Sequence, residues 1–280
     1  MAELEEKVRV LEAALARLDG GALVAFSGGA DSALLAAEGH RVLGERCLAV
    51  TADSPSLPRA ELDAARRFCS GRGIPHRVVP TDEMADRRYT ANGEDRCYFC
   101  KGALFEAMRG IASAEGRPWI LYGAIADDLG DVRPGMRAAA ECGALAPLLE
   151  AGFTKDDVRE RSRALGLPTW DKPAAACLAS RFPPGTPITL EGLGRVERAE
   201  ALLRALGFRQ CRVRLLDDAA RIEVEAADLG RLAASEVRAE VVPRLRALGF
   251  RFVTVDLEGF RPGGLSARPR EEPHGIRRNA

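Results

Sequence analysis

Four short strand candidates that alternate with helical stretches constrain the fold more than any other feature of the chain. They are Ala22–Phe26, Cys47–Ala52, His76–Pro80 and Trp119–Ala124, and each has the length of a strand. Stretches with helical periodicity connect them, and strands that alternate with helices predict βαβ units. We therefore expect an α/β protein in which a parallel sheet carries helices on both faces.

Two long polar stretches interrupt this pattern. Residues 81–96 show little periodicity, and residues 127–147 are rich in Asp, Gly and Pro, so both are expected to be loops, the second with a short helix in it. After them, Thr154 with Asp157 three residues on predicts the beginning of a helix over Lys155–Leu165.

A different pattern begins at Thr189. A helical stretch precedes two segments that alternate apolar and charged residues on either side of a turn, which predicts a hairpin, and a further helix and strand complete a smaller α+β domain. The expected elements are Leu190–Leu206, Arg209–Leu215, Arg221–Glu225, Ser235–Leu248 and Phe250–Asp256. We place one domain at residues 1–187 and the second at 188–262, and we expect a disordered tail over 263–280.

Charge and cysteine content argue against several classes of protein. The 41 basic and 41 acidic residues among 280 give a net charge of zero, which argues against binding nucleic acid or a membrane by charge. No apolar run approaches the ~20 residues of a membrane span, and Met1–Leu18 has the pattern of an amphipathic helix rather than of a signal peptide. Seven cysteines without a disulfide pattern indicate a reducing compartment, so we expect a cytoplasmic protein.

Only four of the basic residues are lysines: Lys7, Lys101, Lys155 and Lys172. This scarcity weakly favours a role for the compact ammonium group at these positions.

The segment SGGADS, at positions 27–32, lies between a predicted buried strand and a helix start. Backbone N–H groups and the hydroxyls of Ser27 and Ser32 can surround an anion at the positive end of the helix dipole, and Gly28 and Gly29 let the backbone approach it. An acidic residue inside a phosphate loop predicts a magnesium ligand, here Asp31. The alternative is a turn that needs glycine only for its conformation. The chain lacks both the Walker sequence and GxGxxG after a strand, which argues against Walker-type and dinucleotide-redox chemistry.

Three further segments concentrate reactive side chains. RCYFCK at 96–101 puts Cys97 and Cys100 at a helix start, GAIADDLGDVRPG at 123–135 gathers carboxylates and an arginine, and KPAAACLASR at 172–181 brings Cys177 beside a serine and two cations. A CxxC pair can bind a cluster, form a redox pair or supply half of a zinc site, although no second CxxC or paired histidines complete a zinc site. The carboxylates of 127–131 could equally form a solvated loop.

Two arginines stand on one face of a strand in the second domain. Arg212 and Arg214 alternate with apolar residues, so their guanidinium groups share one side. If they faced a cleft, they would clamp a phosphate group. The alternative is an exposed strand face whose arginines pair with Glu223 and Glu225 across the hairpin.

Together these residues are similar to a known family. SGGADS resembles the PP-loop of the ATP pyrophosphatase superfamily, whose enzymes split ATP between its α and β phosphates and pass AMP to a substrate oxygen. With the three further segments, the chain over roughly residues 22–256 resembles the LarE family of ATP-dependent sulfur transferases. The resemblance implies a PP-loop (adenine nucleotide alpha hydrolase-like) fold, ATP and Mg²⁺ as ligands, and pyridinium-3,5-biscarboxylic acid mononucleotide, a precursor of a nickel-pincer cofactor, as the small-molecule substrate. It also implies a homo-oligomer and leaves the sulfur donor open.

The resemblance implies roles for individual residues. Cys177, Asp31 and Ser180 are expected to be catalytic, with Asp31 as the magnesium ligand. The residues expected at the nucleotide are Ser27, Gly28, Gly29, Asp31, Ser32, Asp127, Asp128, Arg133, Lys101 and Lys172. The residues expected at the substrate are Arg181, Arg212, Arg214, Glu200 and Glu223. One departure is Ile125, at a position where we expect a polar Asn.

The cysteines distinguish two mechanisms within this family. In one, Cys177 gives up its own sulfur and becomes dehydroalanine; in the other, three cysteines bind a [4Fe–4S] cluster whose open iron carries the transferred sulfide. Cys97 and Cys100 with the distant Cys177 suit a cluster with one open iron, so we expect the second mechanism. Cys47 and Cys69 are interpreted as packing residues. A tRNA thiolase, an ammonia-using synthetase and a nucleotide-sensing protein are the alternatives, and the neutral charge disfavours the first.

Overall fold

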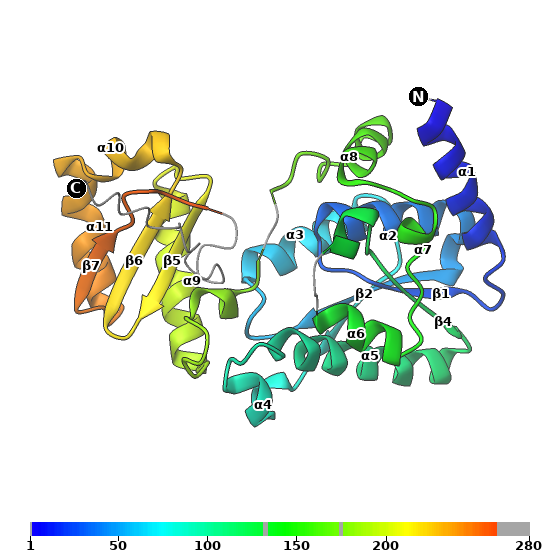
Figure 1. Cartoon of the computed structure of the whole chain (residues 1–280), viewed down its shortest axis with the longest axis horizontal. Coiled ribbons are helices and arrows are strands. Elements are labelled where there is room, and N and C mark those ends of the chain that lie inside the picture. Colours follow the sequence, from blue (N-terminus) through cyan, green and yellow to red (C-terminus); the bar gives the residue numbers. More distant parts are fainter. Residues whose placement is uncertain (1, 131–133, 174–175, 262–280) are drawn as a thin grey trace, which may run out of the picture. The chain divides into compact units, whose positions relative to one another are not determined.

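The computed structural model describes residues 2–130, 134–173 and 176–261, and Figure 1 shows the chain. The chain divides into two compact units, Met1–Cys177 and Leu178–Ala280. We expected the boundary between residues 187 and 188, within the loop that follows the first unit. The expected tail over 263–280 lies outside the described residues.

In the described part of the first unit, four parallel strands form one sheet. They are β1 (Ala22–Ala25), β2 (Cys47–Asp53), β3 (His76–Pro80) and β4 (Trp119–Tyr122), and their order across the sheet is β3-β2-β1-β4. The chain steps outward from β1 to β3 and then returns to the other side of β1. Ligands of open α/β sheets bind at such a reversal, outside the carboxyl ends of the strands. The topology therefore points to the loop that follows β1.

Helices connect the strands, as the sequence predicted. They are α1 (Ala2–Ala16), α2 (Ala30–Leu43), α3 (Arg59–Ser70), α4 (Arg87–Thr90), α5 (Arg96–Glu115), α6 (Pro134–Glu141), α7 (Pro147–Glu150) and α8 (Lys155–Ala164). Helix α5 begins at Arg96 and not near Phe99 as expected, so Cys97 and Cys100 lie in its first turns, three residues apart and on one side. The expected loops contain α4 and α6. Within the described ranges, no helix combines the length and apolarity needed to cross a membrane.

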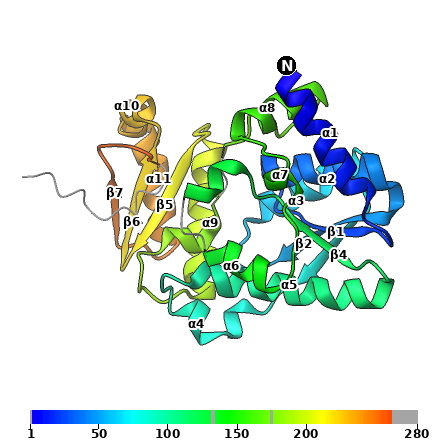
Figure 2. The ribbon, with the colours of Figure 1, turned by 45° about the vertical axis from the view of Figure 1, so that its right-hand side comes forward.

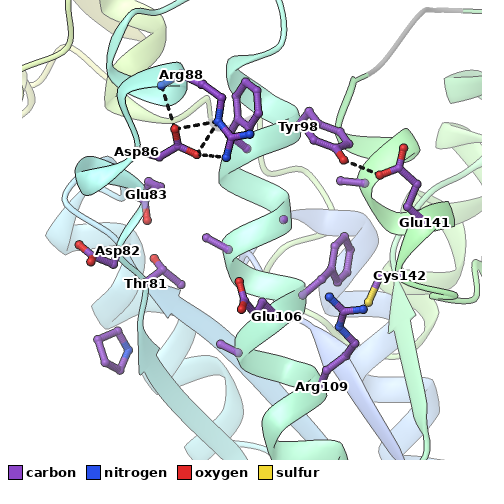
Figure 3. A pocket seen from close by; sticks show the side chains of 17 residues that line it. Thr81, Asp82, Glu83, Asp86, Arg88, Tyr98, Glu106, Arg109, Glu141 and Cys142 are labelled. Atoms are coloured by element: carbon purple, nitrogen blue, oxygen red, sulfur yellow. Dashed lines mark hydrogen bonds and ion pairs between the residues drawn. The ribbon is translucent and has the colours of Figure 1, made fainter.

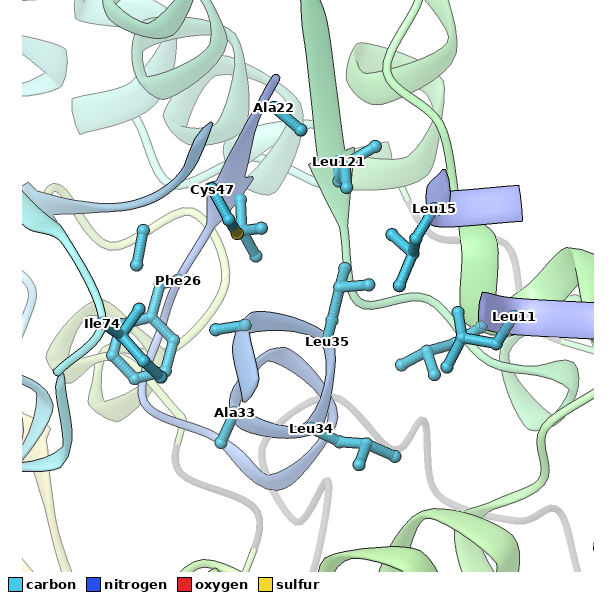
Figure 4. Close-up of a cluster of buried hydrophobic side chains, with 14 of the residues drawn as sticks. Leu11, Leu15, Ala22, Phe26, Ala33, Leu34, Leu35, Cys47, Ile74 and Leu121 are labelled. Carbon is cyan, nitrogen blue, oxygen red and sulfur yellow. The ribbon is translucent and has the colours of Figure 1, made fainter. Parts of the chain in front are cut away.

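Both faces of the sheet are covered. Successive side chains of β1 point to opposite faces, and on each face they lie in a buried core. Ala22 and Val24 belong to a core that includes residues of α1, α2, α3 and α8, and Figure 4 shows Leu11 and Leu15 of α1 in this core. Leu23 and Ala25 belong to the other core, with residues of α5 and α6. Figures 1 and 2 both show α1 and α2 on one side of the sheet and α5 and α6 on the other. The predicted parallel sheet with helices on both faces is confirmed.

The second unit is the smaller α+β module that the sequence predicted. Within its described residues, β5 (Cys211–Leu216), β6 (Ala219–Val224) and β7 (Phe252–Val255) form a sheet in that order. Strands β5 and β6 are the predicted antiparallel hairpin, and β7 pairs parallel to β6. The helices are α9 (Leu190–Ala205), α10 (Leu229–Leu232) and α11 (Ser235–Ala247).

Candidate nucleotide and thiol site

The loop between β1 and α2 forms a cradle at the carboxyl end of an interior strand. Gly28 has a φ of +73°, in the left-handed region that favours glycine. The Ser32 hydroxyl accepts a hydrogen bond from the Ser27 backbone N–H at 3.3 Å and lies 3.1 Å from the Ser27 hydroxyl. Gly29 is the N-cap of α2 and has no side chain to satisfy the N–H groups of the first turn, so these groups are suited to bind an anion.

The end of β4 lies tightly against this loop. A Cβ atom added to Gly123 would lie 2.9 Å from Ser32 N and 3.0 Å from the Asp31 carbonyl carbon, so only glycine fits without displacing the backbone. We assigned no role to Gly123 from the sequence, although its place directly after an expected strand was a signal. Ile125, at the departure from the family pattern, is 3% exposed and packs in the hydrophobic core.

Asp31 is held by a lysine from the beginning of α8. Lys155 Nζ lies 2.7 and 2.9 Å from the two carboxylate oxygens of Asp31, and the Lys155 backbone N–H donates to Asp127 Oδ2 at 2.9 Å. The expected magnesium ligand and one of the expected nucleotide-binding aspartates are therefore brought together through Lys155. Our sequence predictions did not include Lys155 in the site, although the scarcity of lysine marked it.

Other expected nucleotide residues contact the loop or its surroundings. Lys172 Nζ donates to the Gly28 carbonyl at 2.8 Å and to Glu61 Oε2 at 2.6 Å, so it holds the loop through a backbone group. Asp128 accepts from the Ile125 backbone N–H at 3.1 Å. Arg133 lies outside the described residues.

A cavity of about 350 Å³ joins this loop to the predicted thiols. Ser27 of the loop lines it, and so do Cys97, Cys100, Lys101 and Cys177. Apolar residues at and just after the end of β1, in the loop before α3 and in α5 also line the cavity: Ala25, Phe26, Leu57, Pro58 and Leu104. A mostly apolar cavity with a few polar groups is typical of a small-molecule site. The pair Cys97 and Cys100 and the distant Cys177 thus line one cavity together with Ser27 of the phosphate loop.

A larger cavity of about 690 Å³ lies along α5, and Figure 3 shows residues that line it. Tyr98 donates to Glu141 there, and Arg88 pairs with Asp86. None of the described residues that line this cavity belongs to the predicted site. The predicted cysteines, Ser27 and Lys101 line the smaller cavity instead.

The thiols differ in exposure and have a half-buried arginine, Arg96, beside them. Cys97 is exposed, whereas Cys100 and Cys177 are half-buried. Burial, with a smaller contribution from Cys177, raises the pKa of Cys100 to about 12. Arg96 directs Nη2 toward Cys97 Sγ at 3.9 Å and donates to Asn92 Oδ1 at 2.7 Å. Burial alone would lower the pKa of Arg96, but the negative charges of the Cys177 and Cys97 sulfurs raise it overall. Arg96 also lines the cavity, and we assigned it no role from the sequence.

The donor set can be compared with the ligands that an iron–sulfur cluster needs. No group of three or more His, Cys, Asp or Glu side chains among the described residues is arranged to hold a single metal ion. In a [4Fe–4S] cluster each cysteine binds its own iron, so its ligands need not meet at one point. Cys97, Cys100 and Cys177 around one cavity are as many cysteine ligands as such a cluster takes when one iron is left open. Cys47 and Cys69 are buried, as expected of packing residues.

A second group of predicted residues lies within the second unit. Arg181, which is 1% exposed, donates to both carboxylate oxygens of Glu200, at 2.7 and 3.0 Å. The Ser180 hydroxyl accepts from Arg181 at 2.9 Å. Burial alone would raise the pKa of Glu200, but the hydrogen bond and charge of Arg181 lower it overall. Glu200 thus pairs with arginines of its own unit.

The two arginines of β5 are buried, so the alternative of an exposed strand face is wrong, although the pairing with Glu223 that it included is present. Arg212 and Arg214 are 7% and 5% exposed. Arg214 donates to both carboxylate oxygens of Glu223, at 2.9 and 2.6 Å, and Arg221 donates to the same carboxylate at 3.0 Å. Burial and the positive charge of Arg181 lower the pKa of Arg212 to about 10. Buried arginines that crowd one another are suited to bind an anion.

The fold and the glycine loop at its topological reversal define an ATP-using enzyme of the PP-loop class. In line with this class, one subunit of the glutamine-hydrolyzing GMP synthase from Thermoplasma acidophilum is 27% identical over 217 residues, which are 72% of this chain and 64% of that protein. No family model matches the chain.

Two relatives match along nearly their whole length. An uncharacterized protein from Synechocystis sp. is 46% identical over 94% of this chain and 98% of its own. Pyridinium-3,5-bisthiocarboxylic acid mononucleotide synthase from Lactiplantibacillus plantarum is 39% identical over 95% of this chain and 96% of its own. The chain therefore belongs to the LarE family, the family of that synthase, and it is an ATP-using sulfur transferase.

Proposed function

We propose that the protein uses ATP to adenylate a carboxylate of pyridinium-3,5-biscarboxylic acid mononucleotide and then replaces AMP with sulfur, for a nickel-pincer cofactor. The name of the Lactiplantibacillus plantarum relative supports this substrate, because it describes the corresponding bisthiocarboxylic acid. A second round on the other carboxylate would give the dithio product. The zero net charge favours a small mononucleotide over tRNA.

In the first half of the reaction, a substrate carboxylate oxygen attacks the α-phosphorus of ATP and pyrophosphate departs. The hydroxyls of Ser27 and Ser32 and the first N–H groups of α2 would bind the phosphates. Asp31 would hold Mg²⁺, which offsets the charge that develops on pyrophosphate. Lys155 contacts Asp31 in the structure and would move its ammonium group to a phosphate oxygen.

In the second half, sulfur attacks the acyl carbon and AMP leaves. Cys97, Cys100 and Cys177 would hold a [4Fe–4S] cluster, which when bound would supply sulfide at the iron that no cysteine ligates. In the alternative mechanism, Cys177 Sγ attacks the acyl carbon, and the Cβ–Sγ bond then breaks with loss of the Cα proton. That reaction leaves dehydroalanine and limits each molecule to one turnover. The presence of Cys97 and Cys100 at the same cavity favours the first mechanism.

The second unit would bind the phosphate of the mononucleotide. Arg212 and Arg214 are buried beside other arginines, and a phosphate would supply the negative charge that this cluster favours. Glu200 would keep Arg181 in place and Glu223 would keep Arg214 in place through their ion pairs. Ser180 would help to orient Arg181, from which its hydroxyl accepts a hydrogen bond. We also propose a cytoplasmic location and a homo-oligomeric assembly.

The observation that carries the proposal is that Cys97, Cys100 and Cys177 line the same cavity as Ser27 of the phosphate loop. The experiment is anaerobic purification of the wild type and of Cys100→Ala, with analysis of iron and acid-labile sulfide. Cys142→Ala is the matched control, because Cys142 is also half-buried but lines the other cavity. Turnover is followed as AMP release with ATP and the dicarboxylate mononucleotide.

Iron and sulfide that are present in the wild type and in Cys142→Ala but lost in Cys100→Ala would support the cluster. An iron-free wild type that thiolates the substrate once and loses the mass of H₂S at Cys177 would instead establish the sacrificial mechanism. A wild type that releases no AMP with this substrate would contradict the proposed function itself.

A further inference from the structure

Helix α1 contacts the end of α8 that carries Lys155. Lys7 Nζ of α1 donates to Asp157 Oδ2 at 2.8 Å, and both side chains are mostly buried, with 18% and 17% exposed. The hydrogen bond that Lys7 donates to Asp157 raises the pKa of Lys7. Burial alone would raise the pKa of Asp157, but the hydrogen bond from Lys7 and those from Thr154 lower it overall. Both groups therefore stay charged around neutral pH, and their attraction is weakly screened by water.

Asp157 is also the residue that fixes the beginning of α8. Its Oδ2 atom accepts hydrogen bonds from the Thr154 backbone N–H at 2.8 Å and from the Thr154 hydroxyl at 2.7 Å. Thr154 in turn accepts from the Asp157 backbone N–H, which completes a capping box. One carboxylate oxygen thus joins α1 to the N-cap of α8.

The residue after this N-cap is Lys155. Its ammonium group contacts both oxygens of Asp31, and its backbone N–H donates to Asp127. Farther along α8, Arg161 donates to the fully buried Glu38 of α2 at 2.6 Å, so α8 is also attached to the helix that carries Asp31. The orientation of the Lys155 side chain therefore depends on contacts that lie outside the phosphate cavity.

Lys7 is one of the four lysines of the chain, and the proposed function leaves it without a role. Among the other three, Lys155 and Lys172 contact the phosphate loop or Asp31, and Lys101 lines the cavity. A lysine ammonium is a compact point charge, which suits a contact with one carboxylate oxygen that already accepts two other hydrogen bonds.

We infer that Lys7 is a positioning residue for ATP use: through Asp157 and the N-cap of α8, it sets the Lys155 ammonium group at the triphosphate. This inference rests on the proposed binding of the triphosphate beside Asp31. Lys7 itself touches neither Asp31 nor the cavity in the contacts described, so it would act only through Lys155.

The test is a double-mutant cycle on Lys7 and Lys155, read as kcat/KM for Mg·ATP from AMP release in the presence of the dicarboxylate mononucleotide. Lys7→Met should lower kcat/KM about tenfold, since small displacements at a reacting centre cost up to ~10²-fold. In the Lys155→Met background, Lys7→Met should have no further effect, because the group that it positions is gone. Lys7→Arg keeps the positive charge and should therefore retain part of the kcat/KM that Lys7→Met loses. Arg9→Met is the matched control, because Arg9 is an exposed residue of the same helix that pairs with Glu6, and it should leave kcat/KM unchanged.

Asp157→Asn provides a second variant, because it keeps an oxygen for the cap and removes the ion pair, and it should reproduce the fall even if Lys7→Met folds poorly. An equal fall in the wild-type and Lys155→Met backgrounds would show a general structural role and would overturn the inference. So would wild-type kinetics of Lys7→Met or of Asp157→Asn. By contrast, a wild type that releases no AMP would contradict the proposed function and not this inference.

Discussion

Gly123 provides a direct test of how tightly the phosphate loop is held. A Cβ atom at this position would lie 2.9 Å from Ser32 N, 3.0 Å from Asp31 C and 3.1 Å from Ser32 Cα. These are backbone atoms at the beginning of α2, so they cannot rotate away as a side chain would. Gly123 is not among the described residues with positive φ, so alanine is compatible with its backbone and the substitution adds only the steric conflict.

We predict that Gly123→Ala displaces the loop by about half an ångström and lowers the free energy of unfolding by about 1–3 kcal/mol, the usual cost of overpacking. Because the displaced atoms belong to Asp31 and Ser32, kcat/KM for Mg·ATP should fall at least ~10-fold, a larger change than the loss of stability alone would cause. The assays are AMP release and denaturant unfolding, each measured on the wild type and on Gly123→Ala under the same conditions.

The matched control is Gly110→Ala. Gly110 lies in the interior of α5, and no described atom lies within 4 Å of the position of an added Cβ. Alanine should therefore stabilise the protein by about 0.5–1 kcal/mol through its higher helix propensity and leave kcat/KM unchanged. Wild-type kinetics of Gly123→Ala would refute the reasoning, since they would show that the loop can shift without affecting ATP use.

Three other predictions follow from single contacts. Lys172→Met removes the hydrogen bond to the Gly28 carbonyl and should raise KM for Mg·ATP several-fold with little change in stability, which steady-state kinetics would measure; an unchanged KM would count against a role in holding the loop. Arg214→Met leaves the buried Glu223 with less compensation and should destabilise the protein by roughly 3 kcal/mol in urea unfolding, whereas a neutral result would mean that Arg221 alone compensates this charge. Burial lowers the pKa of His76 from 6.5, so the unfolded chain binds the proton more tightly, and stability should fall as the pH drops below 6.5 toward the folded pKa, by at most ~1.4 kcal/mol per pH unit. His76→Gln should flatten this part of the urea-midpoint profile between pH 8 and pH 5.5, and an equally steep profile would assign the pH dependence to another group.

Local sequence patterns were sufficient for most of the secondary structure. The ends of the four strands of the parallel sheet lie within two residues of the expected ends, and the hairpin of β5 and β6 formed where alternation predicted it. Thr154 and Asp157 form the capping box that their spacing predicted. Hydrophobic periodicity and cap residues act over a few residues, so they are visible in the chain itself. The beginning of α5 was less visible, because the charged and aromatic residues around Cys97 have no clear period.

The loop SGGADS and the cysteines could also be identified from the sequence. The types and the spacing of site residues are visible in the sequence, whereas the distances between their side chains are not. The contacts between these residues depended on the tertiary structure. Lys155 reaches Asp31 across 124 positions of the chain, and Lys172 reaches Gly28 across 144.

The burial of Arg212 and Arg214 likewise could not be read from strand alternation. An alternating strand has one polar side whether that side faces solvent or other groups of the fold, and here Arg214 is paired with Glu223 in the interior. The sequence by itself thus determined the elements, the class of chemistry and the candidate residues. The strand order and the packing of the helices decided which distant charges meet, because residues that are more than a hundred positions apart come into contact only in the folded chain.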